Sequence, residues 1–520
     1  MASGPVIAVC IEVASPEILQ SWLKAGWMPN LERLRCSGTW CPLESVAEIS
    51  SGSIWPTFFT GVHPAKHGQF FTHMQIEPGT YRVMKKYADD VPRDPFWMDL
   101  HRAGKVSAII DVPQTRPLNG FNGLHVAGWG GEYPAWKRSS SPRGLMREII
   151  RRFGEHPLVD QYRLAFKPET AAQYERLKGE LGHGVRTKAQ LSRWLFDRGP
   201  FDLFLTVFAE PHWAAHLLWH TMDEGHPSWD DSLSPQYAST FHEIFTGIDR
   251  TIGELHAARP DADVLVFSLS GMGPDYSAWH VLTEVLERIG MAPGRDRHRA
   301  AKVWLPMARW GARRIRAVED LVSLRTIETA KRLVPARLWD TWTRRILHAG
   351  SAWKDSRAFW VPNDYSGSIR VNLKGREPNG RVALGAEYEA VCDEITEALL
   401  ELTDVNTGKK IVRQIVRTHD RYQGKYLDTL PDLLVLWANE SLVNGVHSSK
   451  VGTIRCDFPA RRTGAHRQSA VLVASGPRIR KGITLDYAHI LDLAPTLLYL
   501  ADVRVPDDYD GRVISEMLGS

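Results

Sequence analysis

Residues 203–216 read LFLTVFAEPHWAAH, and this stretch joins an apolar run directly to two closely spaced histidines. The run has the length and composition of a strand buried on both faces, and Glu210, His212 and His216 follow it at once. His212 and His216 are four residues apart, so they share one face of a helical turn. Open α/β sheets bind ligands outside the carboxyl ends of their strands, where two imidazoles can chelate a metal ion. A helix with two half-buried histidines is the alternative interpretation.

Apolar runs of strand length alternate with helical patterns along most of the chain. This alternation is typical of βαβ units, so we expect an α/β fold with a mostly parallel sheet and helices on both faces. The expected strands occupy residues 6–13, 106–112, 201–208, 263–270, 432–438 and 470–475.

We expect a single α/β domain over residues 1–520, with two regions that interrupt the alternation. Residues 135–200 are polar and helix-like, and we interpret them as a helical insertion. Residues 291–350 are rich in arginine and tryptophan, with 14 Lys or Arg against 5 Asp or Glu between positions 295 and 345. This second region is a cap over an anionic substrate, a partner surface, a membrane-surface helix, or a solvated helical face over a tryptophan core.

Composition excludes several classes of protein. The 520 residues are 43% hydrophobic and 24% charged, as in ordinary globular proteins. The net charge of +4 is small for this length, so nucleic acid is not expected as a partner. No run approaches the roughly 18 apolar residues of a membrane span, and the N-terminus lacks the basic region of a signal peptide. Five cysteines without a C-x-x-C pair indicate reduced thiols and a cytoplasmic protein. The oligomeric state stays open, with a dimer as one option.

A third histidine, His466, stands just before the apolar run at 470–475. Together with His212 and His216 it would form a three-histidine set with an open fourth position. Catalytic zinc sites have this arrangement, because the open position takes water or a substrate oxygen.

Residues 50–68 read SSGSIWPTFFTGVHPAKHG and contain the pattern T-G-x-x-P-x-x-H-G. On this pattern the chain resembles the alkaline phosphatase superfamily, in particular its branch of type I phosphodiesterases and nucleotide pyrophosphatases. The resemblance extends over most of the chain, through blocks at residues 27–40, 210–220, 268–274, 369–378, 464–467 and 490–514.

The resemblance implies hydrolysis of a phosphate ester through two metal ions. Ser51, nine residues before Thr60, stands where these enzymes carry the nucleophile that forms a phospho-enzyme. A helix that begins there would direct backbone donors at the phosphoryl group. Alternatively, Ser51 only caps this helix, and Ser50 or Ser53 takes the nucleophile's place.

The chain departs from the family pattern at the metal ligands. Glu12 replaces an aspartate, and Leu269 and Ser270 replace the aspartate and histidine of an S-D-H-G block. Leucine cannot ligate a metal, and serine is a poor neutral ligand. His212 stands where aspartate is usual, whereas His216 and His466 stand in their usual places. One metal site is therefore complete as three histidines, and the other retains Glu12 and Ser51.

We therefore expect a metal-dependent hydrolase or transferase that acts on a phosphate ester or phosphodiester of a small molecule. One zinc ion is expected at His212, His216 and His466, and the lost ligands argue against a second. Ser51 is the expected nucleophile, and Glu12 is a base or a further metal ligand. The alternative is a non-hydrolytic member of the superfamily. Such a protein would bind a phosphorylated or sulfated ligand, or catalyse a different reaction on it.

Three other side chains have two interpretations each. Glu210 is expected to orient one of the histidines as a hydrogen-bond acceptor rather than to ligate the metal. Arg370 and Arg376 would bind phosphate or form ion pairs at the surface.

Overall fold

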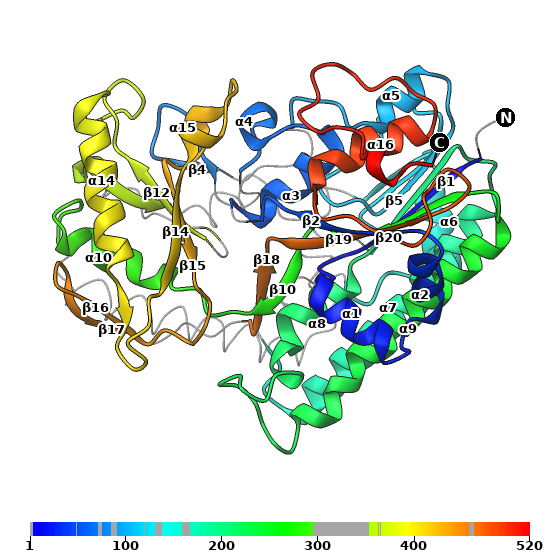
Figure 1. Cartoon of the computed structure of the whole chain (residues 1–520), viewed down its shortest axis with the longest axis horizontal. Helices are drawn as coiled ribbons and strands as arrows, with labels where there is room; N and C mark the ends of the chain where they lie inside the picture. The colour runs from blue at the N-terminus through cyan, green and yellow to red at the C-terminus, as the bar shows by residue number, and fades with distance from the viewer. Residues whose placement is uncertain are drawn as a thin grey trace.

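The computed structural model contains a large mixed sheet and a smaller antiparallel one, drawn at the right and left of Figure 1. Most of the basic region predicted at 291–350 lies outside the described residues. The structure describes residues 4–47, 49–70, 75–84, 91–118, 120–130, 138–158, 167–294, 353–361, 363, 366–456 and 462–519.

The centre of the large sheet is parallel, which confirms the predicted fold class. Strand β1 (Val6–Ile11) pairs in parallel with β8 (Leu203–Phe208) on one side and β9 (Asp263–Phe267) on the other. Beyond β8, the sheet continues in parallel through β5 (Ser107–Ile110) and β6 (Gly123–Ala127). The carboxyl ends of β1, β8 and β9 therefore meet at one edge.

The outer parts of the large sheet include antiparallel strands. Strand β19 (Ser469–Ser475) was expected from its apolar run, and it lies antiparallel to both β9 and β2 (Thr39–Glu44). Strand β7 (Ser139–Ser141) is antiparallel to β6. The short strands β20 (Ile483–Thr484) and β21 (Ala488–His489) pair in parallel with β2.

Both faces of the large sheet are covered by helices, which explains why its central strands are apolar throughout. On β1, Ile7 and Val9 belong to the core on one face, whereas Val6 and Ala8 belong to the core on the other. The first face is covered by α1 (Pro16–Lys24), α2 (Pro29–Cys36), α7 (Ala171–Phe196) and α9 (Ser234–Ala258), and the second by α3 (Ser51–Thr60), α5 (Trp97–Arg102) and α16 (Leu493–Leu500).

The region predicted as a helical insertion at 135–200 carries α6 (Leu145–Phe153) and α7. Leu181 and Leu191 of α7 are buried in the same core as Ile7 and Val9 of β1. This long helix is thus part of the layer that covers the sheet, and the chain runs from it into β8.

The smaller sheet is antiparallel and has its own hydrophobic core. The strand expected at 432–438 is present as β15, but its assignment to the parallel sheet was wrong. A strand buried on both faces has the same apolar composition in either sheet, so its sequence does not reveal its neighbours. The order is β11 (Ala358–Val361), β12 (Gly367–Val371), β15 (Leu433–Trp437) and β14 (Val412–Arg417), with α10 (Leu282–Arg288) and α14 (Ala386–Leu400) contributing to the core.

In the described part of the chain, the remaining short strands form three small sheets of two or three strands each. Strands β10 and β18 pair with each other and lie between the two sheets in Figure 1. The short elements are β3 (Gln75–Ile76), β4 (Val83–Met84), β10 (Gly271–Pro274), β13 (Thr403–Asp404), β16 (Gly445–Ser448), β17 (Gly452–Arg455), β18 (Gly464–Arg467), α4 (Pro64–His67), α8 (Glu210–Leu218) and α15 (Thr418–Arg421).

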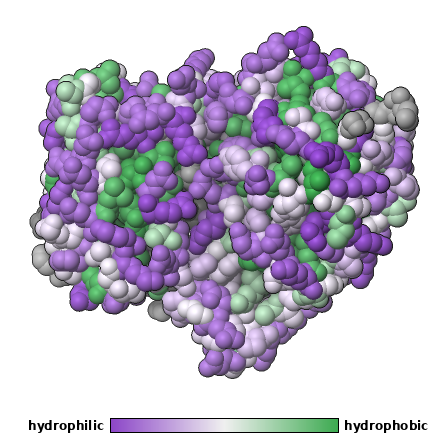
Figure 2. Space-filling model, in the orientation of Figure 1, coloured by the Kyte–Doolittle hydropathy of each residue, from purple (hydrophilic) through white to green (hydrophobic). Residues whose placement is uncertain are grey.

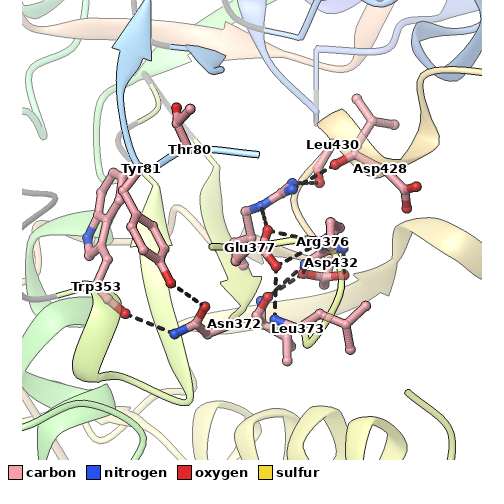
Figure 3. A network of polar contacts seen from close by, with 12 residues as sticks. Thr80, Tyr81, Trp353, Asn372, Leu373, Arg376, Glu377, Asp428, Leu430 and Asp432 are labelled. Atoms are coloured by element: carbon pink, nitrogen blue, oxygen red, sulfur yellow. Dashed lines mark hydrogen bonds and ion pairs between the residues drawn. The ribbon is translucent and has the colours of Figure 1, made fainter. Parts of the chain in front are cut away.

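Arg370 and Arg376 belong to a buried ion-pair network of the smaller sheet, part of which Figure 3 shows. Arg370 Nε donates to Glu377 Oε1 at 2.6 Å, and Arg376 donates to both carboxylate oxygens of Asp432 at 2.8 and 2.7 Å. Tyr388 also donates to Asp432, at 3.0 Å. Both guanidinium groups therefore form ion pairs, although in the interior of the sheet rather than at the surface.

The face of the molecule in Figure 2 is mostly hydrophilic, with apolar residues gathered in patches over both sheets. Within the described ranges, no helix combines the length and hydropathy that crossing a membrane requires.

Candidate metal centre

The structure brings His212, His216 and His466 together, although about 250 residues separate the first two from the third. One ring nitrogen from each lies within 4.8 Å of those of the other two. The ring centroids are 4.5 Å apart for 212 and 216, 4.9 Å for 212 and 466, and 5.2 Å for 216 and 466. Across the part of the chain that the structure describes, this is the one group of three or more His, Cys, Asp or Glu side chains with such spacing.

Two elements at the carboxyl edge of the large sheet hold the histidines. Helix α8 begins two residues after β8 ends, and the spacing of four places His212 and His216 on the same face. His466 is on β18, where it pairs with Met272 of β10. The Thr463 amide donates to the His216 carbonyl at 2.8 Å, which ties the segment before β18 to α8.

Hydrogen bonds at Nδ1 orient two of the imidazoles. His216 Nδ1 lies 2.7 Å from the carbonyl oxygen of Gly464, which only accepts hydrogen bonds, so Nδ1 carries the proton and Nε2 the lone pair. His466 Nδ1 lies 2.9 Å from Ser270 Oγ. Metal-binding histidines are commonly held in this way, through the ring nitrogen that does not face the metal.

The electrostatics of the centre favour neutral imidazoles. Burial lowers the pKa of His216 and His466 well below the ordinary value, and the nearby Arg462 guanidinium and the neighbouring His212 lower both further. Neutral imidazole is the form that ligates a metal, so no proton has to be displaced at neutral pH.

A small cavity beside the histidines brings together the other sequence-predicted residues. Glu12, Ser51, His212 and His466 all line it. Glu12 directly follows β1, and its Oε1 accepts a hydrogen bond from Trp55 Nε1 at 3.0 Å and lies 4.0 Å from His212 Nδ1. Glu12 thus stands beside the three-histidine group without belonging to it.

The three serines at the start of α3 have different roles. Ser50 is the N-cap, because its Oγ accepts from the Gly52 amide at 3.2 Å. Ser53 is fully buried, and its hydroxyl donates to the Phe70 carbonyl at 2.8 Å. Ser51 is the first residue of the helix and the one of the three that lines the cavity.

The residues that replace the second set of metal ligands, Leu269 and Ser270, also line the cavity. Leu269 adds an apolar side chain there. Ser270 hydrogen-bonds His466 and so supports the three-histidine group. Ser270, which stands where the family pattern has a metal ligand, therefore orients His466, a ligand that this chain retains.

Glu210 has a different partner from the one expected. It is buried at the start of α8, and its Oε1 lies 3.0 Å from Nε2 of His156. The expectation that Glu210 orients one of the three clustered histidines was wrong, because its hydrogen bond goes to a fourth histidine. His156 lies in the 135–200 region, where the sequence shows no motif.

Two further cavity residues, Trp55 and Gln114, were not identified from the sequence as site residues. Trp55 lies within the motif at 50–68. Its hydrogen bond to Glu12, which is 43 residues away in the chain, could not be predicted from the sequence. Gln114 lies four residues after the end of β5. It could have been predicted as a site residue only from the rule that ligands bind at the carboxyl ends of strands.

Comparisons with known proteins identify the family of the chain, and one solved structure shares its fold. The family model for type I phosphodiesterase / nucleotide pyrophosphatase matches residues 6–445. Among solved structures, phosphonoacetate hydrolase from Sinorhizobium meliloti 1021 is 14% identical with a TM-score of 0.51, covering 96% of each chain. Human ectonucleotide pyrophosphatase / phosphodiesterase 5 is 13% identical with a TM-score of 0.47, covering 99% of this chain and 100% of that one. No curated protein matches the sequence.

Proposed function

We propose that this protein hydrolyses a phosphate ester or diester with a single zinc ion. The chain belongs to the type I phosphodiesterase / nucleotide pyrophosphatase family of metal-dependent hydrolases. His212, His216 and His466 would hold the ion. The observation that carries the proposal is their convergence beside a cavity that also contains Ser51.

The donor set fits a zinc ion. Three imidazole nitrogens leave one tetrahedral position open, which distinguishes catalytic zinc sites from structural ones. The hydrogen bond from His216 Nδ1 to a carbonyl directs the Nε2 lone pair away from that partner. Zinc bound there supplies a Lewis acid that polarises a phosphoryl oxygen. A second ion is not part of the proposal, because Leu269 occupies a wall where a second set of ligands would be needed.

The surroundings favour an anionic group in the cavity. Ser51 begins α3, a ten-residue helix, so the positive end of the helix dipole is next to it. The guanidinium of Arg462 is close enough to the histidines to affect His216 and His466 electrostatically. A phosphoryl group carries the negative charge that both features would stabilise.

Ser51 and Glu12 are the proposed reacting groups of the protein. Ser51 Oγ attacks phosphorus, the bond from phosphorus to the leaving oxygen breaks, and Glu12 accepts the hydroxyl proton. Water then hydrolyses the phosphoserine, which releases phosphate or a monoester and regenerates Ser51. The hydrogen bond from Trp55 holds one oxygen of Glu12 in place for this transfer.

Metal analysis combined with turnover of aryl phosphate mono- and diesters tests the proposal. We expect about one zinc per chain in the purified protein, and loss of both zinc and turnover in His216→Ala. His183→Ala is the matched control, because His183 is exposed on α7 and should leave both unchanged. A wild-type protein without zinc and without turnover contradicts the proposal, and two zinc ions per chain contradict the single-ion form.

Two variants separate the proposed roles of the reacting groups. Ser51→Ala should abolish turnover while zinc content stays the same, and undiminished turnover would remove Ser51 from the mechanism. Glu12→Gln should lower turnover and shift its acidic pH limit, since the proton acceptor is gone.

We further propose that the enzyme acts in the cytoplasm on a small phosphorylated molecule. In the described part of the chain, which includes all five cysteines, no disulfide is present, and this supports a reducing compartment. Fractionation of cells that express the tagged protein tests the location.

A further inference from the structure

Gln114 is a buried polar residue in the wall of the cavity that Ser51, His212 and His466 also line. It is 6% exposed, and its Oε1 is buried without a hydrogen-bond partner among the described residues. A buried amide in this state costs free energy relative to an apolar side chain of the same size. Packing alone therefore does not account for a glutamine at this position.

The backbone of Gln114 adds a second cost. Its φ angle is 57°, in the left-handed region that residues with a Cβ atom rarely adopt. Asparagine and aspartate tolerate this region better than glutamine, because their short side chains can hydrogen-bond locally. Strained backbone of this kind persists where the surrounding structure enforces it, and it is concentrated at ligand-binding sites.

Contacts on both sides of Gln114 enforce its conformation. Before it, the buried carboxylate of Asp111 binds Lys188 Nζ at 2.6 Å and accepts hydrogen bonds from two backbone amides at 2.8 and 3.1 Å. After it, Thr115 Oγ1 donates to the Val112 carbonyl at 2.6 Å. The loop is thus held by hydrogen bonds on both sides of Gln114, whose side chain lies at the cavity with Oε1 unpaired among the described residues.

We propose that Gln114 recognises the substrate by donating a hydrogen bond from its amide to a non-bridging phosphoryl oxygen. The inference rests on the proposed function and names a residue that positions its substrate. Rotation about the terminal bond exchanges the amide oxygen and nitrogen, so the side chain can present two N–H donors to an anion. In the proposed reaction, the phosphoryl group is the part of the substrate that reaches both Ser51 and the histidines. When it is ionised, its oxygens accept hydrogen bonds and donate none.

Binding of inorganic phosphate, a reaction product, tests the proposal in the full-length zinc-loaded protein. We expect the dissociation constant for phosphate, measured by calorimetry, to rise about tenfold in both Gln114→Leu and Gln114→Gly. Zinc content should stay at the wild-type value. The two variants differ in stability: leucine retains the backbone strain, whereas glycine relieves it, so Gln114→Gly should unfold at the same or a higher temperature than wild type.

Asn439→Gly is the control for the change in backbone freedom. Asn439 has a φ angle of 54°, close to that of Gln114, but it follows β15 in the smaller sheet and does not line the cavity. Its substitution should leave the affinity for phosphate unchanged.

Equal affinity for phosphate in wild type and both Gln114 variants would overturn the proposal, and so would binding too weak to measure in all three. Loss of zinc from Gln114→Leu would also overturn it, because the residue would then support the metal centre instead of the substrate. Failure of the proposed function has a different signature, namely wild-type protein without zinc and without turnover. In that case the dependence of phosphate binding on Gln114, measured in the metal-free protein, still decides this inference.

Discussion

Two polar clusters, one in the interior of the smaller sheet and one at the carboxyl edge of the large sheet, differ in how the charges of their members are balanced. In the smaller sheet, Arg370, Arg376, Glu377 and Asp432 form ion pairs with one another, so each charge is balanced within the cluster. At the large sheet, His212, His216 and His466 are like groups whose positive forms would repel each other, and burial lowers the pKa of His216 and His466 well below the ordinary value.

This difference distinguishes a structural cluster from one prepared for a ligand. Opposite charges that pair inside the protein are costly to separate, because removal of one partner leaves the other charge buried alone, and they have little capacity for another partner. Three neutral imidazoles whose lone pairs lie close together can instead bind a metal cation, which interacts favourably with all three. We therefore expect substitutions in the two clusters to affect different measurements.

The largest expected effect is on activity, in the histidine cluster. His466→Ala should lower turnover of aryl phosphates by about a thousandfold or more, because the removed ligand helps to bind a metal worth several kcal/mol in the transition state. Stability of the metal-free protein to urea should fall by less than about 2 kcal/mol. Activity within tenfold of wild type would show that the histidine cluster does not catalyse the reaction.

The next effect is on stability, in the ion-pair cluster. Asp432→Ala leaves the largely buried guanidinium of Arg376 with Glu377 as its ion-pair partner and without Asp432, which should destabilise the protein by about 3–5 kcal/mol in urea unfolding. Below the unfolding transition, turnover per folded molecule should match wild type. A loss of turnover without a loss of stability would reverse the roles that we assign to the two clusters.

Ser270→Ala should have an intermediate effect, confined to metal affinity. The hydroxyl holds His466 through Nδ1, and loss of such a contact weakens zinc binding by about 10- to 100-fold. Zinc competition with a fluorescent chelator measures the change. Ser277→Ala is a control, since its hydroxyl bonds only to the nearby Asp275 among the contacts described. Unaltered zinc affinity in Ser270→Ala would mean that Ser270 does not position His466.

A further effect, small over any one pH unit, is expected on the pH dependence of stability. Burial lowers the pKa of His67 from 6.5 to about 3, so below pH 6.5 the unfolded chain binds a proton that the folded chain does not. Stability should therefore fall as the pH decreases from 6.5 toward 3, by up to about 1.4 kcal/mol per pH unit for this residue. His67→Gln should reduce this slope in urea unfolding between pH 7 and 5, whereas the exposed His183→Gln should not.

The ion-pair cluster should respond to pH in a more acidic range. Burial raises the pKa of Asp432, but the charge of Arg376 and its hydrogen bonds outweigh burial and lower the pKa below the ordinary 3.8. Its contribution to stability is present above pH 3.8 and is lost as the pH falls through the lower folded value. A stability profile that is flat between pH 6.5 and 4 would contradict the separation of the two ranges.

Much of the fold could be predicted because its signals are local. The apolar runs of β1, β8 and β9 and the spacing of His212 and His216 depend on neighbours within one element. The strand at 432–438 was also recognised, but its sheet was not, since strand pairing is a long-range property. The same reason applies to Arg376, whose partner Asp432 is 56 residues away.

For the candidate site, the sequence by itself determined the types of side chain available: three histidines, a carboxylate, a serine at a helix start, and a leucine and serine in place of ligands. Residue type sets which atoms can donate, accept or ligate, and it does not depend on the fold. Only the tertiary structure decided that these groups meet, that Ser51 rather than Ser50 or Ser53 lines the cavity, and that Ser270 and Gln114 belong there. Those facts depend on distances and directions between elements far apart in the chain, which are set when the sheets and helices pack.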